Sequence, residues 1–567
     1  MCAKFELGKL TALKLLLYIL ENKMASQRKR KYGSIAEPSE DALNESLKSL
    51  NDSSEQGTST TEDEEDEQNY DGGTVLFYDR IHGHFTLPKV LTKIIDTPHF
   101  QRLRNISQMG GASYVFTGAT HTRFQHCLGT AHLAGRLCTA LQQRQPLLDI
   151  SPKDILCVQI AGLCHDIGYG PFSKLFDKSF LKRTRPDCKW SHEDGSIALF
   201  DHMWKANDLG SVFQDYLNDQ DIVFIKEMIQ GNPLDGEDTS SWSFKGRPAS
   251  KSFLYQIVSN KTSGVDVDKF DYLARDSFHL GLQSTFHQDR YIESARVIQC
   301  DDQYHICTRD KDARMMYELF HTRLLLQRTA VCHKTVRAIK LMLADVLVKA
   351  DAYVRIPGEG AKRFRMSECI DDMDAFLKLN DNVLTLIETL TPQDSSLRLR
   401  EAQDILKRIQ KRDLYTYIGE KVLRHPLKNE EKLCVKLNEI FKWVTQKDDF
   451  VVVFERFDYG MKEVNPVDQL WFYTKSEPDV GVRVKRGDLS NMLTSVYCEH
   501  VVRVYSKKTD HFFNVRMRET FREFSLWCDD QSVGVAGSDD SGVNGGGGDV
   551  ATNDRGSIIN GVMGRER

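Results

Sequence analysis

The chain of 567 residues is long enough to bury a large core and to form two or three folding units. Its net charge of -5, with 40% apolar and 28% charged residues, is ordinary for a globular protein and does not indicate a generally nucleic-acid-binding surface. The 13 cysteines are scattered and odd in number, which argues against a disulfide framework and for a reducing compartment.

The first 73 residues are predicted to be disordered, with two local features. A Leu-rich run from Leu10 to Leu20 contains Lys14 and is too short to cross a bilayer, so we expect no membrane partner. The basic cluster from Arg28 to Lys31 is typical of a nuclear import signal, and equally of a solvated tail. Residues 33–73 are polar and acidic, and such a composition cannot bury enough apolar surface to offset the entropy of ordering.

Ordered structure is expected from Thr74. A short strand is predicted over 75–78, a turn over 82–84, and helical structure over 90–107 with a new helix beginning at Pro98. Further helices are predicted over 126–143, 152–165, 192–205, 210–229, 251–260, 266–277, 312–351, 368–390 and 396–412. Strand-like alternation follows late, over 450–457, 470–474, 480–485 and 501–505, before a last helix over 514–528.

These elements predict a mainly α protein. We expect a helical domain over 74–415, a smaller α+β lobe over 416–529, and a flexible tail rich in Gly, Asp and Ser over 530–567. The long regular spacing of apolar residues before position 415, and its replacement by alternation afterwards, is the basis for this division.

One apolar helix ends at a His–Asp pair, His165-Asp166, shortly before Gly168. At a helix end both side chains can turn toward one point, and with His126 and Asp268 they would form a set of two imidazoles and two carboxylates. Such a set suits Zn, Fe or Mn and leaves positions open for water or substrate oxygens. Taken singly, each residue is more typical of a core histidine or a helix N-terminal charge. As a group they favour a metal site.

Longer strings around these residues resemble the SAM- and HD-domain dNTP triphosphohydrolases of the HD-domain phosphohydrolase superfamily. They include "HTRFQHCLGTAHLAG", "AGLCHDIGYGPFSKLFD", "QIVSNKTSGVDVDKFDYLARDSFHLG" and "DYGMKEVNPVDQLWFY". The resemblance covers about residues 74–528 and implies that the helical domain is an HD domain. Residues 1–73 are too polar for the five-helix SAM unit, so we expect no SAM domain there.

The resemblance implies a reaction and a set of roles. One Zn, Fe or Mn ion per subunit, held by the four residues above, serves the attack of water on the α-phosphate of a dNTP, and triphosphate leaves the deoxynucleoside. Mg accompanies the bound nucleotides. His192 matches the catalytic histidine and Asp177 the acid that supports it. The substrate positions are Arg123, Lys269 and Arg323 for the triphosphate, Tyr272 and Asp276 for the sugar, Gln108 and Met109 near the base and sugar, and Tyr169 and Lys174 in the adjoining loop.

The resemblance also implies a regulatory nucleotide site between subunits, where GTP and dNTP effectors drive assembly of a homo-oligomer from dimer to tetramer. The matching positions are Asp96, Gln101, Arg104, Val115, Phe116, Arg290, Arg309, Lys311, His333, Lys334 and Arg412. Single-stranded nucleic acid is a further candidate partner. The expected location is the nucleus, the cytoplasm or both, with roles in dNTP catabolism and antiviral defence.

Several positions depart from the family's pattern. Tyr169 and Lys174 each stand where the family has His, and a phenol with a pKa near ~10 is a poor proton relay at neutral pH. Gln327 and Val331 replace a His and a Tyr around the substrate, so discrimination against ribonucleotides is expected to weaken. At the regulatory site Lys, Asn and Lys are replaced by Val75, Met315 and Thr416, which should lower phosphate affinity.

Two functions remain open at this point. The first is a metal-dependent dNTP triphosphohydrolase of reduced or altered activity. The second is a catalytically impaired nucleotide- or nucleic-acid-binding regulator that retains the HD fold. The complete ligand set favours the enzyme, because a pure binding protein has little reason to keep all four ligands.

Overall fold

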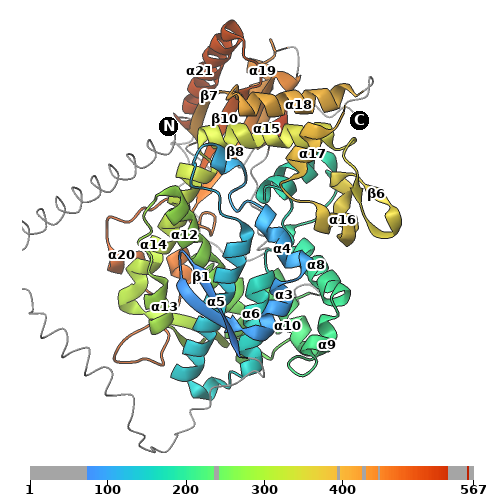
Figure 1. Ribbon diagram of the computed structural model, residues 1–567. Helices are drawn as coiled ribbons and strands as arrows, with labels where there is room; N and C mark the ends of the chain where they lie inside the picture. Colours follow the sequence, from blue (N-terminus) through green and yellow to red (C-terminus); the bar gives the residue numbers. More distant parts are fainter. Residues whose placement is uncertain are drawn as a thin grey trace, which may run out of the picture. The chain divides into compact units, whose positions relative to one another are not determined.

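The structure is a computed structural model that describes residues 73–234, 242–391, 396–423, 430–444, 447–533 and 558–560 (Figure 1). The Leu-rich run, the basic cluster and the rest of the N-terminal segment up to residue 72 lie outside these residues, as does most of the C-terminal tail. The prediction of a mainly α protein with a smaller strand-containing region is confirmed. No helix in the described part of the chain has both the length and the apolar composition needed to cross a bilayer.

An antiparallel hairpin opens the described chain. Strands β1 (Thr74–Asp79) and β2 (Gly83–Pro88) pair from Thr74 with Pro88 to Asp79 with Gly83. Helices follow in this order: α3 (Thr92–Ile95), α4 (Pro98–Gln101), α5 (Arg123–Arg144), α6 (Pro152–Cys164), α7 (Lys182–Thr184), α8 (His192–Ala206), α9 (Leu209–Phe213), α10 (Asp219–Gln230), α11 (Tyr255–Val258), α12 (Val267–Leu280) and α13 (Gln288–Ser294).

The second half of the helical region contains α14 (Ala313–Leu326), α15 (Lys334–Ala350), α16 (Met373–Lys378), α17 (Val383–Thr389) and α18 (Leu397–Gln410). Two small sheets interrupt it. One joins β3 (Arg296–Cys300), β4 (Gln303–Arg309) and β9 (Phe472–Tyr473), and the other joins β5 (Ile356–Pro357) and β6 (Arg363–Phe364).

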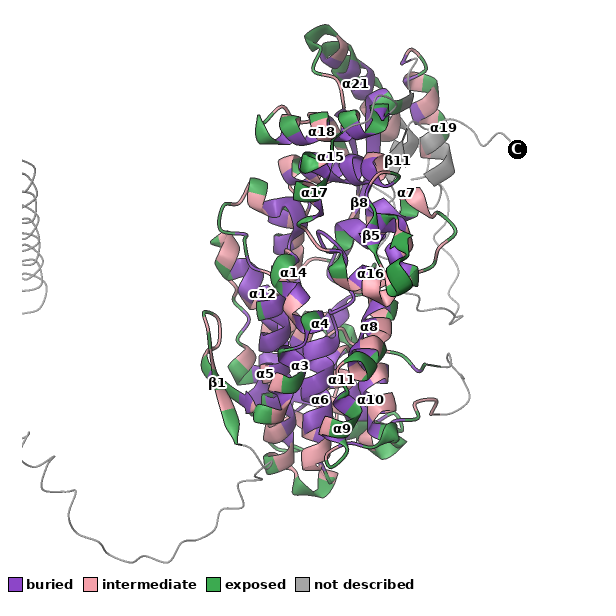
Figure 2. Cartoon of the chain, turned by 45° about the vertical axis from the view of Figure 1, so that its right-hand side comes forward, coloured by how far each residue is buried: buried purple, intermediate pink, exposed green. Residues whose placement is uncertain are grey.

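The core that positions the site is the pair α5 and α6, with α12 packed on α5 (Figure 2). Both helices of the pair begin at capping boxes, formed by Thr122 with Gln125 and by Ser151 with Asp154, as expected for a polar residue before an apolar run. Gly162 lets the two backbones approach closely, since a Cβ there would lie 2.9 Å from the Cα of Ala131. This close contact brings the end of α6 near the start of α5.

The helix predicted over 368–390 is α16 and α17, with a break over 379–382, and two longer predicted helices are also divided in the structure. The helix predicted over 210–229 is α9 and α10, because Asn218 caps the start of α10 with its side chain. The helix predicted over 312–351 is α14 and α15, because the chain turns at His333, whose ring accepts a hydrogen bond from the Thr335 amide. Apolar periodicity continues across both breaks, so it did not reveal them. The prediction also missed β3 and β4, and only an isolated bridge, Phe472 with Val482, forms near the strand predicted over 480–485.

The C-terminal region contains an antiparallel sheet in the order β11-β8-β10-β7. Its strands are β7 (Thr416–Leu423), β8 (Phe450–Asp458), β10 (Cys498–Ser506) and β11 (Ile558–Asn560), accompanied by α19 (Glu430–Ile440), α20 (Arg486–Leu489) and α21 (His511–Val533). The pairing of β11 with β8 falls inside the tail predicted to be flexible. The composition of the tail did not predict it, because pairing at an open sheet edge uses backbone groups.

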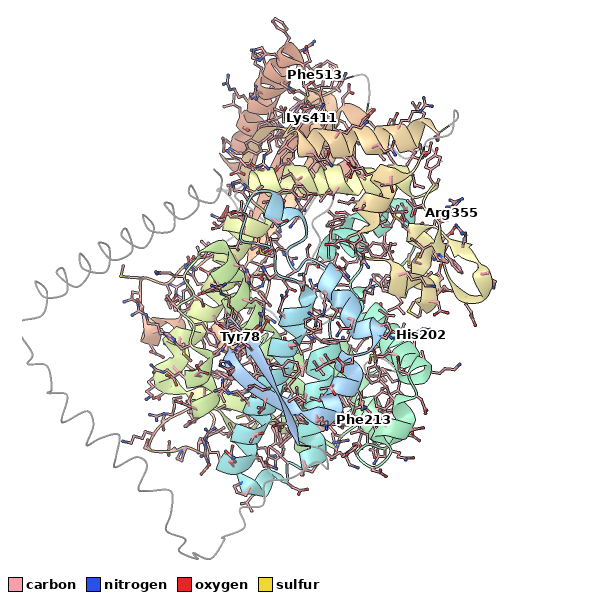
Figure 3. The ribbon with its side chains drawn as sticks, in the orientation of Figure 1. Tyr78, His202, Phe213, Arg355, Lys411 and Phe513 are labelled. Carbon is pink, nitrogen blue, oxygen red and sulfur yellow. The ribbon has the colours of Figure 1, made fainter. Side chains whose placement is uncertain are left out.

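A pair of histidines, of which His99 is buried and His202 is half-buried, joins α4 to α8. Nε2 of His99 lies 2.8 Å from Nδ1 of His202, which is labelled in Figure 3. Asn207 and Arg102 also face His99, and Asp374 lies beyond His202. Burial, His202 and Arg102 together lower the pKa of His99 to about 4, with Asp374 opposing the shift.

Acid is therefore expected to destabilise the protein through His99. The unfolded residue, with a pKa near ~6.5, binds a proton that the folded residue does not bind until about pH 4. Neutral His99 contributes on the order of 3 kcal/mol to the free energy of unfolding. This contribution is complete above the unfolded pKa and is lost as the pH falls from about 6.5 to about 4. Urea unfolding at pH 7 and pH 4.5 should show a smaller pH dependence in His99→Gln than in the parent or in a His287→Gln control. An equal pH dependence of the unfolding free energy in the parent and both variants would contradict this role of His99.

Candidate active site

Three helix ends position the four residues predicted to bind a metal. His126 lies in the first turn of α5, His165 is the residue at which α6 ends, and Asp166 follows it. Asp268 lies in the first turn of α12, where Asp266 caps the helix by accepting a hydrogen bond from the Lys269 amide. Each of the four predicted metal ligands thus lies at or next to a helix terminus.

The structure brings these four side chains around one point. The Nε2 atoms of His126 and His165 lie 3.2 Å apart. Oδ1 of Asp268 is 3.1 Å from Nε2 of His126 and 3.5 Å from Nε2 of His165. Oδ2 of Asp166 is 3.4 Å and 3.5 Å from the same two nitrogens. The ligand atoms of His126, His165 and Asp166 all lie within 4.8 Å of one another.

The electrostatics of this group suit a cation. Burial alone would raise the pKa of Asp166, but Arg123, His165 and His126 hold it well below its usual range. Burial likewise opposes ionisation of Asp268, whereas His126 and His165 lower its pKa. Two carboxylates kept ionised beside two imidazoles form the mixed donor set that divalent transition metals prefer, so the residues present fit such an ion.

Asp271 is a residue of this site that was not predicted from the sequence. Its Oδ2 accepts a hydrogen bond from Nδ1 of His126 at 2.7 Å, on the far side of the ring from the ligand group. Asp271 follows Asp268 by three residues in α12, and the two therefore lie on one helix side. That spacing was the available signal, but it is common on solvated helix faces.

Next to the ligands, Tyr169 lies between two residues predicted to act on the substrate. Its ring stacks on the His192 ring, with centroids 4.0 Å apart, and the Arg123 guanidinium lies 3.3 Å from its centroid on a cation–π contact. Arg123 also forms an ion pair with Asp166. Burial raises the pKa of Tyr169 well above its usual value, with Asp166, Asp177 and Glu193 adding to the shift and Arg123 opposing it. The phenol is therefore neutral.

His192 and Asp177 face one another without a direct hydrogen bond. Nδ1 of His192 lies 3.6 Å from Oδ2 of Asp177 and 3.1 Å from Oε2 of Glu193. Both carboxylate oxygens of Asp177 are buried and make no hydrogen bond to the described residues. Burial opposes ionisation of Glu193, but His192 and Lys261 lower its pKa. Two acids thus flank the same imidazole nitrogen.

Cationic side chains predicted to contact triphosphate lie beside the ligands. Lys269 follows Asp268 and places Nζ 3.1 Å from Asp266. Burial opposes its charge, but Asp266 raises its pKa, so the ammonium is retained. Arg323 donates to the backbone and side chain of Asp458 at 2.7 and 3.0 Å. Burial raises the pKa of Tyr272 to about 12, while Arg323 and Lys269 oppose this shift, which shows that both cations lie close to that ring.

The remaining predicted substrate positions surround this group. Oδ1 of Asp276 lies 2.6 Å from Nε2 of His121. The backbone N–H of Gln108 donates to the backbone carbonyl of His121 at 3.1 Å. Met109 is buried, and Lys174 is exposed. At the two replaced positions, Gln327 donates to the Arg456 carbonyl at 2.9 Å, and Val331 accepts at its carbonyl from Lys340 at 3.1 Å.

The predicted regulatory positions fall into three groups within one chain. In the first, Arg104 donates to Gln101 at 2.7 Å near Asp96, the residue that ends α3. In the second, the rings of Phe116 and His333 lie 5.8 Å apart. This second group also contains Val115, Lys334 above the Tyr417 ring, and Arg412, which donates to the Tyr114 carbonyl.

The third regulatory group lies around α13 and β4. Arg290 donates to Asp312 at 2.7 Å, while Arg309 and the exposed Lys311 adjoin Asp310. Of the replaced regulatory positions, Val75 lies in β1, Met315 in α14 and Thr416 begins β7. The assignment of all these positions to one nucleotide site stays a prediction.

Comparison with known proteins places this site in a family. A family model described as HD domain matches residues 123–207, which include three of the four predicted ligands. The chain is 45% identical over 477 residues to the deoxynucleoside triphosphate triphosphohydrolase SAMHD1 of Mus musculus, covering 80% of this chain and 71% of that protein. It is 45% identical over 466 residues to the protein of the same name from Homo sapiens, covering 80% and 73%.

A more distant relative gives the same result. The SAMHD1 homolog of Dictyostelium discoideum, also named a deoxynucleoside triphosphate triphosphohydrolase, is 33% identical over 441 residues, covering 77% of this chain and 78% of that protein. Similarity over 77–80% of the chain extends well beyond residues 123–207, which the HD-domain model matches. The chain belongs to the SAMHD1 family of HD-domain proteins.

Proposed function

We propose that this protein hydrolyses deoxynucleoside triphosphates to deoxynucleoside and triphosphate in a metal-dependent reaction. The observation that carries this proposal is the convergence of His126, His165, Asp166 and Asp268 beside cationic side chains. The names of the relatives, all deoxynucleoside triphosphate triphosphohydrolases, support the choice of substrate.

Different residues of the chain hold the metal, bind the triphosphate and donate a proton. A divalent ion held by the four ligands supplies Lewis acidity, which lowers the pKa of water and polarises a phosphoryl oxygen. Arg123, Lys269 and Arg323 bind and orient the triphosphate, because fixed cations are the expected partners of a polyanion. Water attacks the α-phosphorus, the bond to the 5′ oxygen breaks, and His192 is placed to give that oxygen its proton. Asp177 and Glu193 lie 3.6 Å and 3.1 Å from Nδ1 of His192 and can orient its ring.

A second candidate function is that of a nucleotide-binding regulator with impaired catalysis. The observation that favours it is Tyr169, whose neutral ring stacks on both His192 and Arg123. In this position the Tyr169 ring contacts His192 and Arg123 but does not relay a proton. The orphaned carboxylate of Asp177 is consistent with a weakened proton-delivery network.

Restoring the family's histidines distinguishes the two functions. We expect the parent chain to hydrolyse dNTPs already, and the double variant Tyr169→His, Lys174→His to be faster by about tenfold or less, well under the ~10²–10⁴-fold that a complete acid–base group contributes. Initial rates with Mn²⁺ or Mg²⁺, a dNTP panel and GTP measure this. Tyr78→His, at an exposed residue labelled in Figure 3, is the matched control. A parent without turnover and a variant with strong turnover would favour the regulator.

The finer assignments belong to the same proposal. We infer that the resident ion is Zn, Fe or Mn, that Mg accompanies bound nucleotides, and that GTP and dNTP effectors drive assembly of a homo-oligomer. The three regulatory groups are consistent with this, because a site between subunits gathers residues from different chains. We also propose location in the nucleus, the cytoplasm or both, and single-stranded nucleic acid as a further partner, from the sequence alone.

A further inference from the structure

A buried charged network connects the β1–β2 hairpin to His126. Its centre is Asp271, whose side chain is fully buried. Oδ1 accepts from Nε2 of His82 at 2.7 Å and from Arg275 at 2.8 Å, while Oδ2 accepts from Nδ1 of His126 at 2.7 Å and from Arg275 at 2.9 Å. Each oxygen thus accepts two hydrogen bonds, so the orientation of the carboxylate is fixed from four directions.

The outer end of the network lies in the hairpin and α13. Asp79, the last residue of β1, accepts from the amides of Ile81 and His82 at 2.7 and 3.1 Å and pairs with Arg275 at 2.8 Å. The second ring nitrogen of His82 lies 3.2 Å from the amide nitrogen of Gln288. The hairpin turn therefore contacts two of the three side chains that donate to Asp271, namely His82 and Arg275.

The network fixes the form of His126 that can bind a cation. The Arg275 guanidinium donates to both oxygens of Asp271, which is the paired arrangement of an arginine with a carboxylate. An ionised carboxylate only accepts hydrogen bonds, so Nδ1 of His126 carries the hydrogen and Nε2 presents its lone pair to the ligand group. The backbone of α5 closes the space around Asp271, because a Cβ on Gly129 would lie 1.9 Å from its Oδ1.

We propose that Asp271 is a positioning residue for metal binding and that the β1–β2 hairpin, through His82, is part of the metal site. This rests on the proposed function only in that the four ligands bind a divalent ion. The hairpin is remote from the HD motif in sequence, yet two hydrogen bonds connect it to the ring of the ligand His126. An outer-shell carboxylate of this kind orients the ligand ring and raises its basicity.

The test measures affinity for Mn²⁺ in the full chain after removal of metal, by competition with a chelator, and does not depend on hydrolysis. We expect Asp271→Asn to weaken binding by about 10–100-fold, because the amide cannot accept from both histidines and Arg275. His82→Asn, which is too short to reach Asp271, should weaken binding by a smaller factor of about 3–10. The matched controls are His84→Asn, exposed on the same hairpin, and Asp289→Asn, exposed on α13.

Each result decides a part of the proposal. If Asp271→Asn binds Mn²⁺ like the parent but unfolds at lower urea, the residue is only structural and the proposal fails. If Asp271→Asn fails to fold, His82→Asn against His84→Asn decides, and equal affinities of these two overturn the role of the hairpin. A parent chain that binds no Mn²⁺ would overturn the proposed function as well, which separates the two failures.

Discussion

Exchange of His165 for Ala is expected to abolish metal binding and to lower dNTP hydrolysis by at least about 10³-fold. His165 ends α6 and brings its Nε2 within 3.5 Å of both predicted carboxylate ligands. Its Nδ1 donates a hydrogen bond to the Gly162 carbonyl at 2.8 Å, which leaves Nε2 to face the other predicted ligands. The loss corresponds to several kcal/mol of transition-state stabilisation supplied by a bound cation.

The measurement combines metal content of the purified protein with single-turnover hydrolysis. His287→Ala, at an exposed residue of the same type, is the control and should retain both. Because the His165 ring is buried, the unfolding midpoint of the metal-free variant must be compared with that of the metal-free parent. A folded variant that keeps its metal and its turnover would remove His165 from the ligand set.

Replacement of His192 by Ala is expected to lower kcat by about 10²–10⁴-fold while leaving metal affinity unchanged. His192 is the first residue of α8, and its Nδ1 is flanked by the carboxylates of Asp177 and Glu193. Without this proton donor the 5′ oxygen must leave as an alkoxide. The substrate-binding cations Lys269 and Arg323 come from other helices, so KM should change less than kcat.

Two further measurements separate a catalytic role from a structural one. The alkaline limb of the parent's kcat profile, where a proton donor loses its proton, should be altered in Asp177→Asn, in which one flanking carboxylate is lost, and His192→Ala should lose this limb altogether. Hydrolysis is followed over pH 5–9 with saturating dNTP. If His192→Ala reduces metal affinity in parallel with kcat, the residue supports the metal site and the assignment as proton donor is wrong.

The sequence predicted those parts of the fold whose signals are local. The helices α5, α6, α8 and α12 begin within a few residues of the predicted positions, because side-chain caps such as Thr122, Ser151, Ser191 and Asp266 mark their starts. The division of the chain between α14 and α15 was missed, because the break at His333 lies within an uninterrupted apolar pattern.

The candidate site was predictable as a list of residues but not as a set of contacts. The His165-Asp166 pair, together with the resemblance of the surrounding strings to a known family, predicted the metal ligands. The stacking of Tyr169 between Arg123 and His192 depends on the packing of a loop against two helices, and no spacing in the sequence encodes it. Asp271 was missed for the same reason, since its importance comes from His82, 189 residues away in the chain.

The identity of the products tests the central claim most directly. Metal-free protein is titrated with Mn²⁺ in the presence of a dNTP and ¹⁸O-water, and the separated products are identified by mass spectrometry. The account predicts turnover that saturates near one ion per subunit, with deoxynucleoside as one product and triphosphate carrying the ¹⁸O as the other. Formation of deoxynucleoside monophosphate and pyrophosphate, or no turnover at any Mn²⁺ concentration, would contradict it.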